Sequence, residues 1–120
     1  MQNSNIENSL REANLMENDD FLITTIGGDY WQKFLIFPNQ VRGYYYFTNK
    51  RIIFIGGFAG STKWFVPYKN IKSVEKCFAG PFIPCGIKIE FFDETKNTEK
   101  KYKMSVLKRG EWINFIKERI

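Results

Sequence analysis

Residues 43–55 read GYYYFTNKRIIFI, two runs of aromatic and β-branched residues separated by a short polar turn. Tyr, Phe, Thr and Ile suit the pleated, packed surface of a β-strand, and Asn49 tolerates the left-handed backbone of a tight turn. The stretch therefore predicts a β-hairpin. Lys50 and Arg51 belong to its turn, where we expect both side chains to lie in solvent.

Strand-like patterns continue on both sides of this hairpin. Residues 20–27 read as a first strand, which Gly27 and Gly28 are expected to end. Residues 63–68, 71–78, 86–91 and 101–106 predict four more strands, and the last two alternate apolar with polar residues. From residue 110 the apolar spacing changes to three and four, which is typical of an amphipathic helix. The chain thus predicts seven strands followed by one helix.

Length and composition agree with a small β-rich domain. A chain of 120 residues can bury roughly two-thirds of its unfolded surface without disulfides or metals. The 12 Phe residues, scattered through strand-like runs, favour a barrel or sandwich over a helical bundle. No apolar run approaches the length of a membrane span, and the polar start lacks the features of a signal peptide. We therefore expect a cytoplasmic protein, which could also be peripheral to a membrane.

The charges divide the chain into two parts. Residues 1–20 carry five acids against one base, whereas residues 21–120 carry 17 bases against eight acids. Residues 1–19 are read as an acidic leader, either a short amphipathic helix or disordered, and residues 20–120 as the domain. A basic domain suits anionic partners, although ordinary solubility also explains such a charge. The leader could fold back over the cationic face and compete with its ligand.

Catalytic and metal-binding patterns are missing from the sequence. There is no histidine, the commonest general base and transition-metal ligand. Cys77 and Cys85, with seven residues between them, fit neither a disulfide framework nor zinc spacing. We expect no enzyme activity, no metal and no cofactor. Residues 42–47 begin like an RNA-recognition signature, but Tyr45 and Asn49 break it, which argues against nucleic acid.

Two segments resemble the GRAM and bacterial PH-like branch of the pleckstrin-homology superfold. Residues 43–54 resemble its pattern of Gly, aromatic strand, Thr-Asn turn, basic pair and apolar strand, and residues 66–74 resemble its next signature. The resemblance covers about residues 20–120. It implies a mainly β fold, a PH-like seven-stranded antiparallel barrel or sandwich capped by a C-terminal α-helix. It also implies a non-catalytic module that binds lipids, peptides or proteins.

The segment DYWQKFLIFP, residues 29–38, has two interpretations. It could be a docking loop whose aromatic residues meet a bilayer or a partner's groove while Lys33 meets an anionic group. It could instead continue the first strand to Phe37 and complete the core, which we favour because aromatic runs are more often packed. As a loop it would lie beside the loop after residue 56.

The predicted ligand face combines these two segments with Arg42, the other base that precedes the hairpin. Its residues are Trp31, Lys33, Phe34, Phe37, Arg42, Phe58 and Lys63. Phosphoinositide-binding relatives carry several bases in the loop between their first two strands, whereas this segment offers only Lys33 and Arg42. The predicted function is docking to an anionic membrane surface or lipid headgroup. The alternative is an adaptor that binds a partner protein through the same face.

Overall fold

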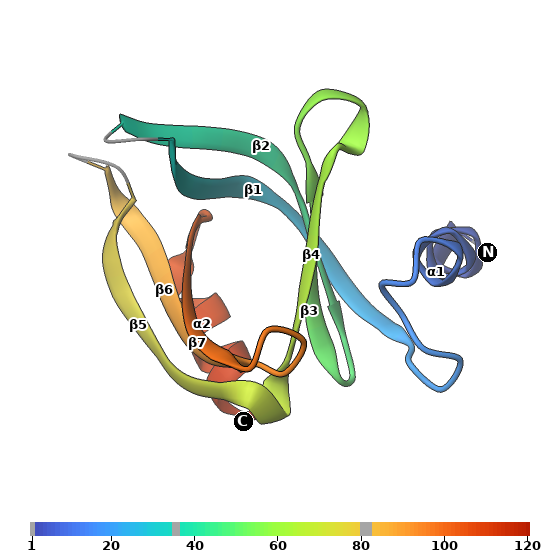
Figure 1. The fold of residues 1–120 in the computed structure, drawn as a ribbon. Coiled ribbons are helices and arrows are strands. Elements are labelled where there is room, and N and C mark those ends of the chain that lie inside the picture. Colours follow the sequence, from blue (N-terminus) through green and yellow to red (C-terminus); the bar gives the residue numbers. More distant parts are fainter. Residues whose placement is uncertain (1, 35–36, 80–82) are drawn as a thin grey trace.

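The computed structural model describes the chain except residues 1, 35–36 and 80–82, and side chains adjoining these gaps are also outside the description (Figure 1). Within the described residues, seven strands form one antiparallel sheet in the order β4-β3-β2-β1-β7-β6-β5. The elements are α1 (Gln2–Glu12), β1 (Leu22–Phe34), β2 (Phe37–Thr48), β3 (Arg51–Gly56), η1 (Phe58–Gly60), β4 (Thr62–Pro67), η2 (Tyr68–Asn70), β5 (Ile71–Ala79), β6 (Ile83–Asp93), β7 (Thr98–Ser105) and α2 (Arg109–Lys117). The predicted mainly β, PH-like fold is confirmed.

The predicted hairpin forms from β2 and β3, which pair from Gly43 opposite Gly56 to Phe47 opposite Ile52. The Thr48 hydroxyl accepts hydrogen bonds from the backbone N–H groups of Lys50 and Arg51, at 3.1 and 3.0 Å, and so holds the turn. Side chains of alternate residues, among them Tyr45 and Phe47, point into the barrel and are fully buried. The hairpin therefore contributes one wall of the core.

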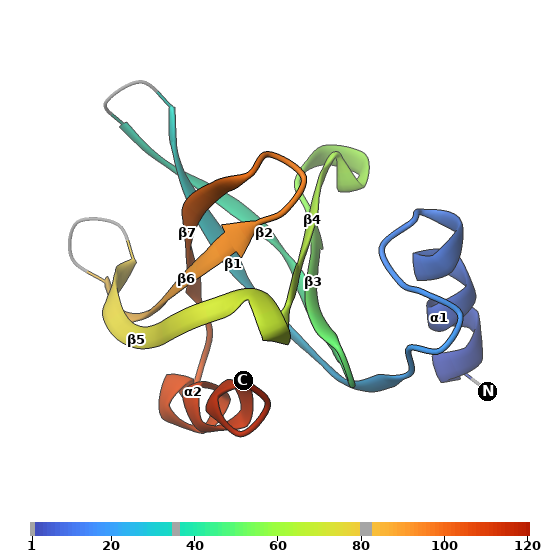
Figure 2. The same cartoon turned by 60° about the horizontal axis from the view of Figure 1, so that its bottom comes forward.

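Helix α2 closes one end of the curled sheet (Figure 2). Its Trp112 ring stacks on Phe47 with centroids 4.9 Å apart, and Ile113 and Ile116 are buried against the same core. The apolar stripe predicted from residue 110 is thus confirmed, except that Ile120 is 49% exposed. The stacked rings stabilise the position of α2 over the end of the barrel, in addition to the burial of its apolar side chains.

Three glycines lie side by side on β1, β2 and β3, because Gly28 pairs with Gly43 and Gly43 pairs with Gly56. A Cβ atom on Gly43 would lie 2.3 Å from the Ile55 oxygen and 2.6 Å from the Gly56 Cα. Only glycine permits such an approach, which is typical of a tight bend at a barrel corner. We call this row the glycine crease. The expectation that Gly27 and Gly28 end the first strand is wrong, because β1 runs through both.

The segment expected to be either a loop or a continued strand is a hairpin. β1 continues as far as Phe34, and β2 begins at Phe37, with these two residues paired. In the described part of the chain, β1 pairs with β7 at residues 29–31 alone, and β2 pairs with β3 from Gly43 onward. Residues 32–34 and 37–40 therefore form a two-stranded arm beyond the barrel (Figures 1 and 2). Continuation of the first strand is confirmed to Phe34 and not to Phe37.

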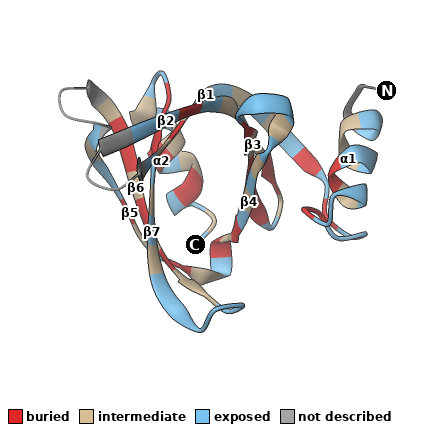
Figure 3. Ribbon diagram, turned by 45° about the horizontal axis from the view of Figure 1, so that its top comes forward, coloured by how far each residue is buried: buried red, intermediate tan, exposed pale blue. Residues whose placement is uncertain are grey.

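The acidic leader contains the short helix α1 and packs on the outer face of β3 (Figure 3). Leu10, Leu15 and Met16 form a second apolar cluster with Ile53, which is 0% exposed. Strand β3 consequently has both faces covered, since Ile52 on its other face lies in the barrel core. A strand buried on both faces reads as a continuous apolar run, as residues 52–55 do.

Candidate functional site

Four predicted residues lie in the arm or at its base. Trp31 is half-buried, and its indole N–H donates a hydrogen bond to the Ser105 hydroxyl at 3.0 Å. This bond fixes the ring against β7, where Trp31 lies opposite Lys103. The backbones of Lys33, Phe34 and Phe37 lie in the arm, and their side chains are outside the described part of the structure.

Arg42, Phe58 and Lys63 are placed around the loop that joins β3 to β4. The Arg42 side chain is 84% exposed and lies 3.5 Å from the Asp29 carboxylate, while its carbonyl accepts a hydrogen bond from Gly57. Phe58 is 92% exposed in η1. Lys63 is exposed at the start of β4 and takes part in no ion pair among the described residues. The structure therefore brings these three predicted residues together.

Tyr44 joins this group, and sequence reasoning missed it. It lies two residues after Arg42 on the same face of β2, opposite Ile55, which in turn lies opposite Lys63. Its ring is 58% exposed and covers the backbone of Gly27. Three consecutive tyrosines gave no signal of which faces outward. We call Arg42, Tyr44, Phe58 and Lys63 the loop-end patch; the β3–β4 loop and the arm project from the same end of the barrel (Figures 1 and 2).

The basic pair of the hairpin turn belongs to a different environment. Arg51 is 6% exposed, with its guanidinium 3.1 Å from Asp20 and 2.7 Å from Glu17, and it donates a hydrogen bond to the Leu15 carbonyl. Lys50 forms an ion pair with Asp19. The expectation of a solvated turn is wrong for Arg51, because acids more than thirty residues earlier fold over it. Because these acids are far from the turn in the sequence, local sequence patterns could not predict the contact.

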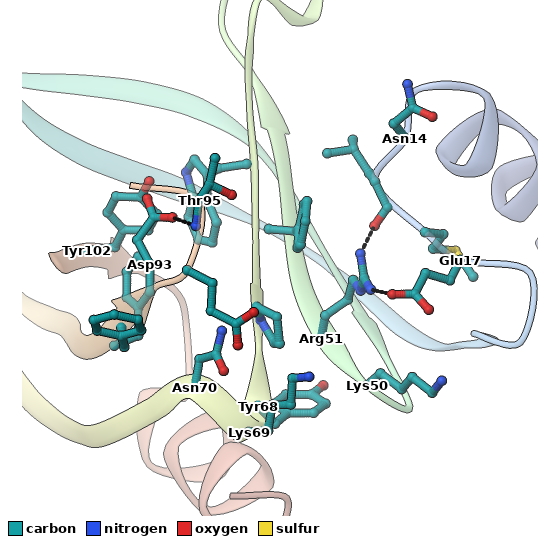
Figure 4. A pocket seen from close by; sticks show the side chains of 18 of the residues that line it. Asn14, Glu17, Lys50, Arg51, Tyr68, Lys69, Asn70, Asp93, Thr95 and Tyr102 are labelled. Atoms are coloured by element: carbon teal, nitrogen blue, oxygen red, sulfur yellow. Dashed lines mark hydrogen bonds and ion pairs between the residues drawn. The ribbon is translucent and has the colours of Figure 1, made fainter. Parts of the chain in front are cut away.

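A cleft of about 1110 Å³ lies along the outer edge of β4 (Figure 4). Residues 14–17 line one side and residues 93–96 line the other, while β4 passes between them. Inside the barrel mouth the rings of Trp64 and Tyr102 pack with centroids 4.5 Å apart. Lys63, Lys69 and Lys96 are exposed around the rim. The cleft therefore combines an open strand, an aromatic floor and a mainly basic rim.

Local interactions favour the neutral form of the buried phenols in this region and the charged form of Asp93. Burial raises the pKa of Tyr102, and a hydrogen bond from Lys100 lowers the pKa of Asp93. The buried Trp64 indole N–H has no hydrogen-bond partner among the described residues. No group of three or more His, Cys, Asp or Glu suited to a metal ion occurs in the described ranges. The arrangement offers binding surfaces, with charged rims and apolar rings.

The model of the GRAM domain family matches residues 5–120. The chain belongs to this family. GRAM is a PH-like family of binding domains that are generally associated with membranes or lipids. The match begins within α1, so most of the leader lies inside the matched range of this GRAM domain. In the part of the chain that the structure describes, no helix is long and apolar enough to cross a membrane.

Among the solved structures similar to this GRAM domain, one matches it over nearly its whole length. It is the crystal structure of the C-terminal domain of an unknown protein from Leishmania infantum, with a TM-score of 0.66 and 14% sequence identity. The similarity covers 97% of this chain and 94% of that chain. At this sequence identity it supports the fold alone. No curated protein matches the chain.

Proposed function

We propose that this GRAM domain docks on anionic membrane surfaces through the loop-end patch and the arm. The exposure of Phe58 carries the proposal. Its side chain, on a turn of η1, is 92% exposed, so moving it from water into the apolar part of a bilayer is favourable in free energy. Burying a Phe side chain fully contributes roughly 1.5–3 kcal/mol. The arm, which includes Phe34 and Phe37 in its sequence, projects from the same end and adds apolar residues.

Charge supports the same orientation. Lys63 and Arg42 flank Tyr44 and Phe58 on the exposed end, and residues 21–120 carry nine more bases than acids. A base near an anionic bilayer contributes about 1 kcal/mol, and the attraction is screened within a Debye length. A few such bases with one inserted ring give weak binding that depends steeply on salt. The family assignment supports a membrane or lipid association in general terms.

The test is sedimentation with neutral and anionic phospholipid vesicles at low and at physiological salt. We expect binding to anionic vesicles only, and weaker binding as salt rises. Lys63→Glu changes the charge by two, which predicts a loss of about 30-fold at about 1 kcal/mol per charge. Lys117→Glu is the matched control, since Lys117 is exposed on α2 at the other end of the barrel (Figure 2). Equal losses in both variants would show unspecific attraction and refute the orientation.

Phe58→Ala separates insertion from charge. We expect at least a tenfold loss of vesicle binding that persists at high salt, because the ring's contribution is apolar. Ile120→Ala removes another apolar side chain, which is 49% exposed just after α2 at the other end of the barrel, and should leave binding unchanged. The double variant Lys33→Glu with Lys63→Glu should abolish binding. Retained binding in that variant would refute the assignment of these bases to the site.

A further inference from the structure

The sheet has two free edges among the described residues, β4 and β5, and they differ in regularity. The pairing of β5 with β6 shifts register at two places, exposed Lys72 and Lys76 lie along β5, and α2 packs against it. Bulges, lysines and a covering helix are the usual devices that keep an edge strand from pairing with another chain. β4 pairs with β3 at six consecutive positions without a register shift. Its edge therefore lacks two of these three devices and carries a single lysine.

The hydrogen-bond pattern shows which β4 groups face outward. The Tyr68 N–H donates to the Lys50 carbonyl at 3.0 Å, and hydrogen-bonded pairs alternate along an antiparallel ladder. Residues 62, 64 and 66 therefore bond to β3. Lys63 and Phe65 direct their N–H and C=O groups toward the open edge, whereas Pro67, at the end of the strand, has no N–H to offer. Among the described residues, the N–H and C=O groups of Lys63 and Phe65 thus line the cleft without a strand partner.

The cleft has the shape and charge to receive one further strand. The six residues of β4 span about 20 Å, the length of an ordinary strand. A strand added here would alternate its side chains between two sides of the edge. On the inner side they would meet the rings of Trp64 and Tyr102, and on the outer side they would meet Lys63, which forms no ion pair among the described residues. Apolar residues suit the first side and acidic residues suit the second.

We propose that the β4 edge binds an extended peptide that alternates acidic and apolar residues, by adding it to the sheet as an eighth strand. Main-chain hydrogen bonds supply affinity in this mode, and alternate side chains supply specificity. The edge is distinct from Phe58 and the arm, so the proposal stands independently of membrane docking. Because Lys63 contributes to both surfaces, a membrane and an acidic peptide would compete at that residue.

Amide hydrogen exchange measured by NMR on the whole chain tests strand addition directly. The probe is a ten-residue synthetic peptide of alternating valine and glutamate, with valine–lysine alternation as the charge control. We expect exchange at the Lys63 and Phe65 amides to slow at least tenfold with the glutamate peptide. The Trp64 and Val66 amides, already bonded to β3, should change little. Unchanged exchange at Lys63 and Phe65 with millimolar probe would overturn the proposal.

Two variants separate backbone pairing from side-chain contact. Phe65→Pro removes the outward N–H at a position where an edge strand tolerates proline, and Phe65→Val removes the same ring but keeps the N–H. Peptide binding should fall at least tenfold in the proline variant relative to the valine variant, with circular dichroism confirming that both fold. Equal binding would refute strand pairing. Protection of the same amides by rising protein concentration alone would make a second copy the occupant and contradict the peptide proposal.

Discussion

Gly43 has no room for a side chain, although it lies in the middle of a strand. Replacing it with alanine would force a Cβ to within 2.6 Å of two backbone atoms, which cannot move like the end of a flexible side chain. We expect Gly43→Ala to lower the free energy of unfolding by about 3 kcal/mol in urea titrations. Gly110→Ala is the matched control, because no atom lies within 4 Å of its added Cβ. Similar losses in both variants would contradict a steric role for the glycine crease.

Arg51 neutralises the buried carboxylate of Asp20. The Asp20 side chain is 0% exposed, and removing the guanidinium would leave its carboxylate buried with the Lys50 amine at 4.0 Å and a hydrogen bond from the Glu17 backbone N–H at 3.2 Å. Breaking a buried pair by removing one partner costs about 3–5 kcal/mol, and we expect Arg51→Met to fall at the lower end. Lys72→Met breaks an exposed pair with Glu99 and should change stability by less than about 1 kcal/mol. Comparable values in the two variants would show that the leader does not depend on Arg51.

At the scale of elements, the leader is attached by its apolar residues as well as its charges. Leu10 is 2% exposed in the cluster with Ile53, so Leu10→Ser should cost about 3 kcal/mol and speed amide exchange throughout α1. Asn8→Ser, at an exposed position of the same helix, serves as the control. If α1 amides exchange equally in both variants, the helix does not rely on this contact. Competition between the leader and a membrane stays a prediction, to be tested by vesicle binding after deletion of residues 1–18.

Elements whose signals are local could be predicted, and contacts between distant segments could not. The β2–β3 hairpin, the alternating strands β6 and β7 and helix α2 follow from periodicity and turn residues within each segment. The two glycines of β1 indicate a strand end in the sequence. Gly28 is instead required by the close approach of Ser105 and pairs with Gly43, both of which lie on other strands. The burial of Arg51 depends in the same way on acids in the leader. Tyr44 could not be assigned to a face, since the two residues that follow it, Tyr45 and Tyr46, are also tyrosines.

At the scale of the whole molecule, the buried phenols predict a limit of stability at high pH. Burial raises the pKa of Tyr30 to about 12 and raises the pKa values of Tyr45 and Tyr68, whose hydroxyls also donate to backbone carbonyls. Tyrosines of the unfolded chain ionise near 10, so above that pH the unfolded state loses protons first. Stability is then fully present below about pH 10 and falls as the pH rises toward 12.

Phenolate absorbance during alkaline titration checks this prediction. We expect ionisation of most tyrosines to lag behind that of the urea-unfolded chain and to coincide with loss of β-sheet circular dichroism. Tyr30→Phe should reduce the loss of stability between about pH 10 and 12, because it removes one phenol that ionises earlier in the unfolded state. Complete ionisation near pH 10 with the fold intact would contradict burial of these rings.

The docking of the leader on β3 also bears on the order of synthesis. A ribosome makes Leu10, Leu15 and Met16 before it makes Ile53, the residue against which they pack. It likewise makes Glu17 and Asp20 before their partner Arg51. A nascent chain therefore exposes this cluster until the β2–β3 hairpin has left the exit tunnel. During that interval we expect the leader to be open to binding by a chaperone, until its place on the sheet has formed.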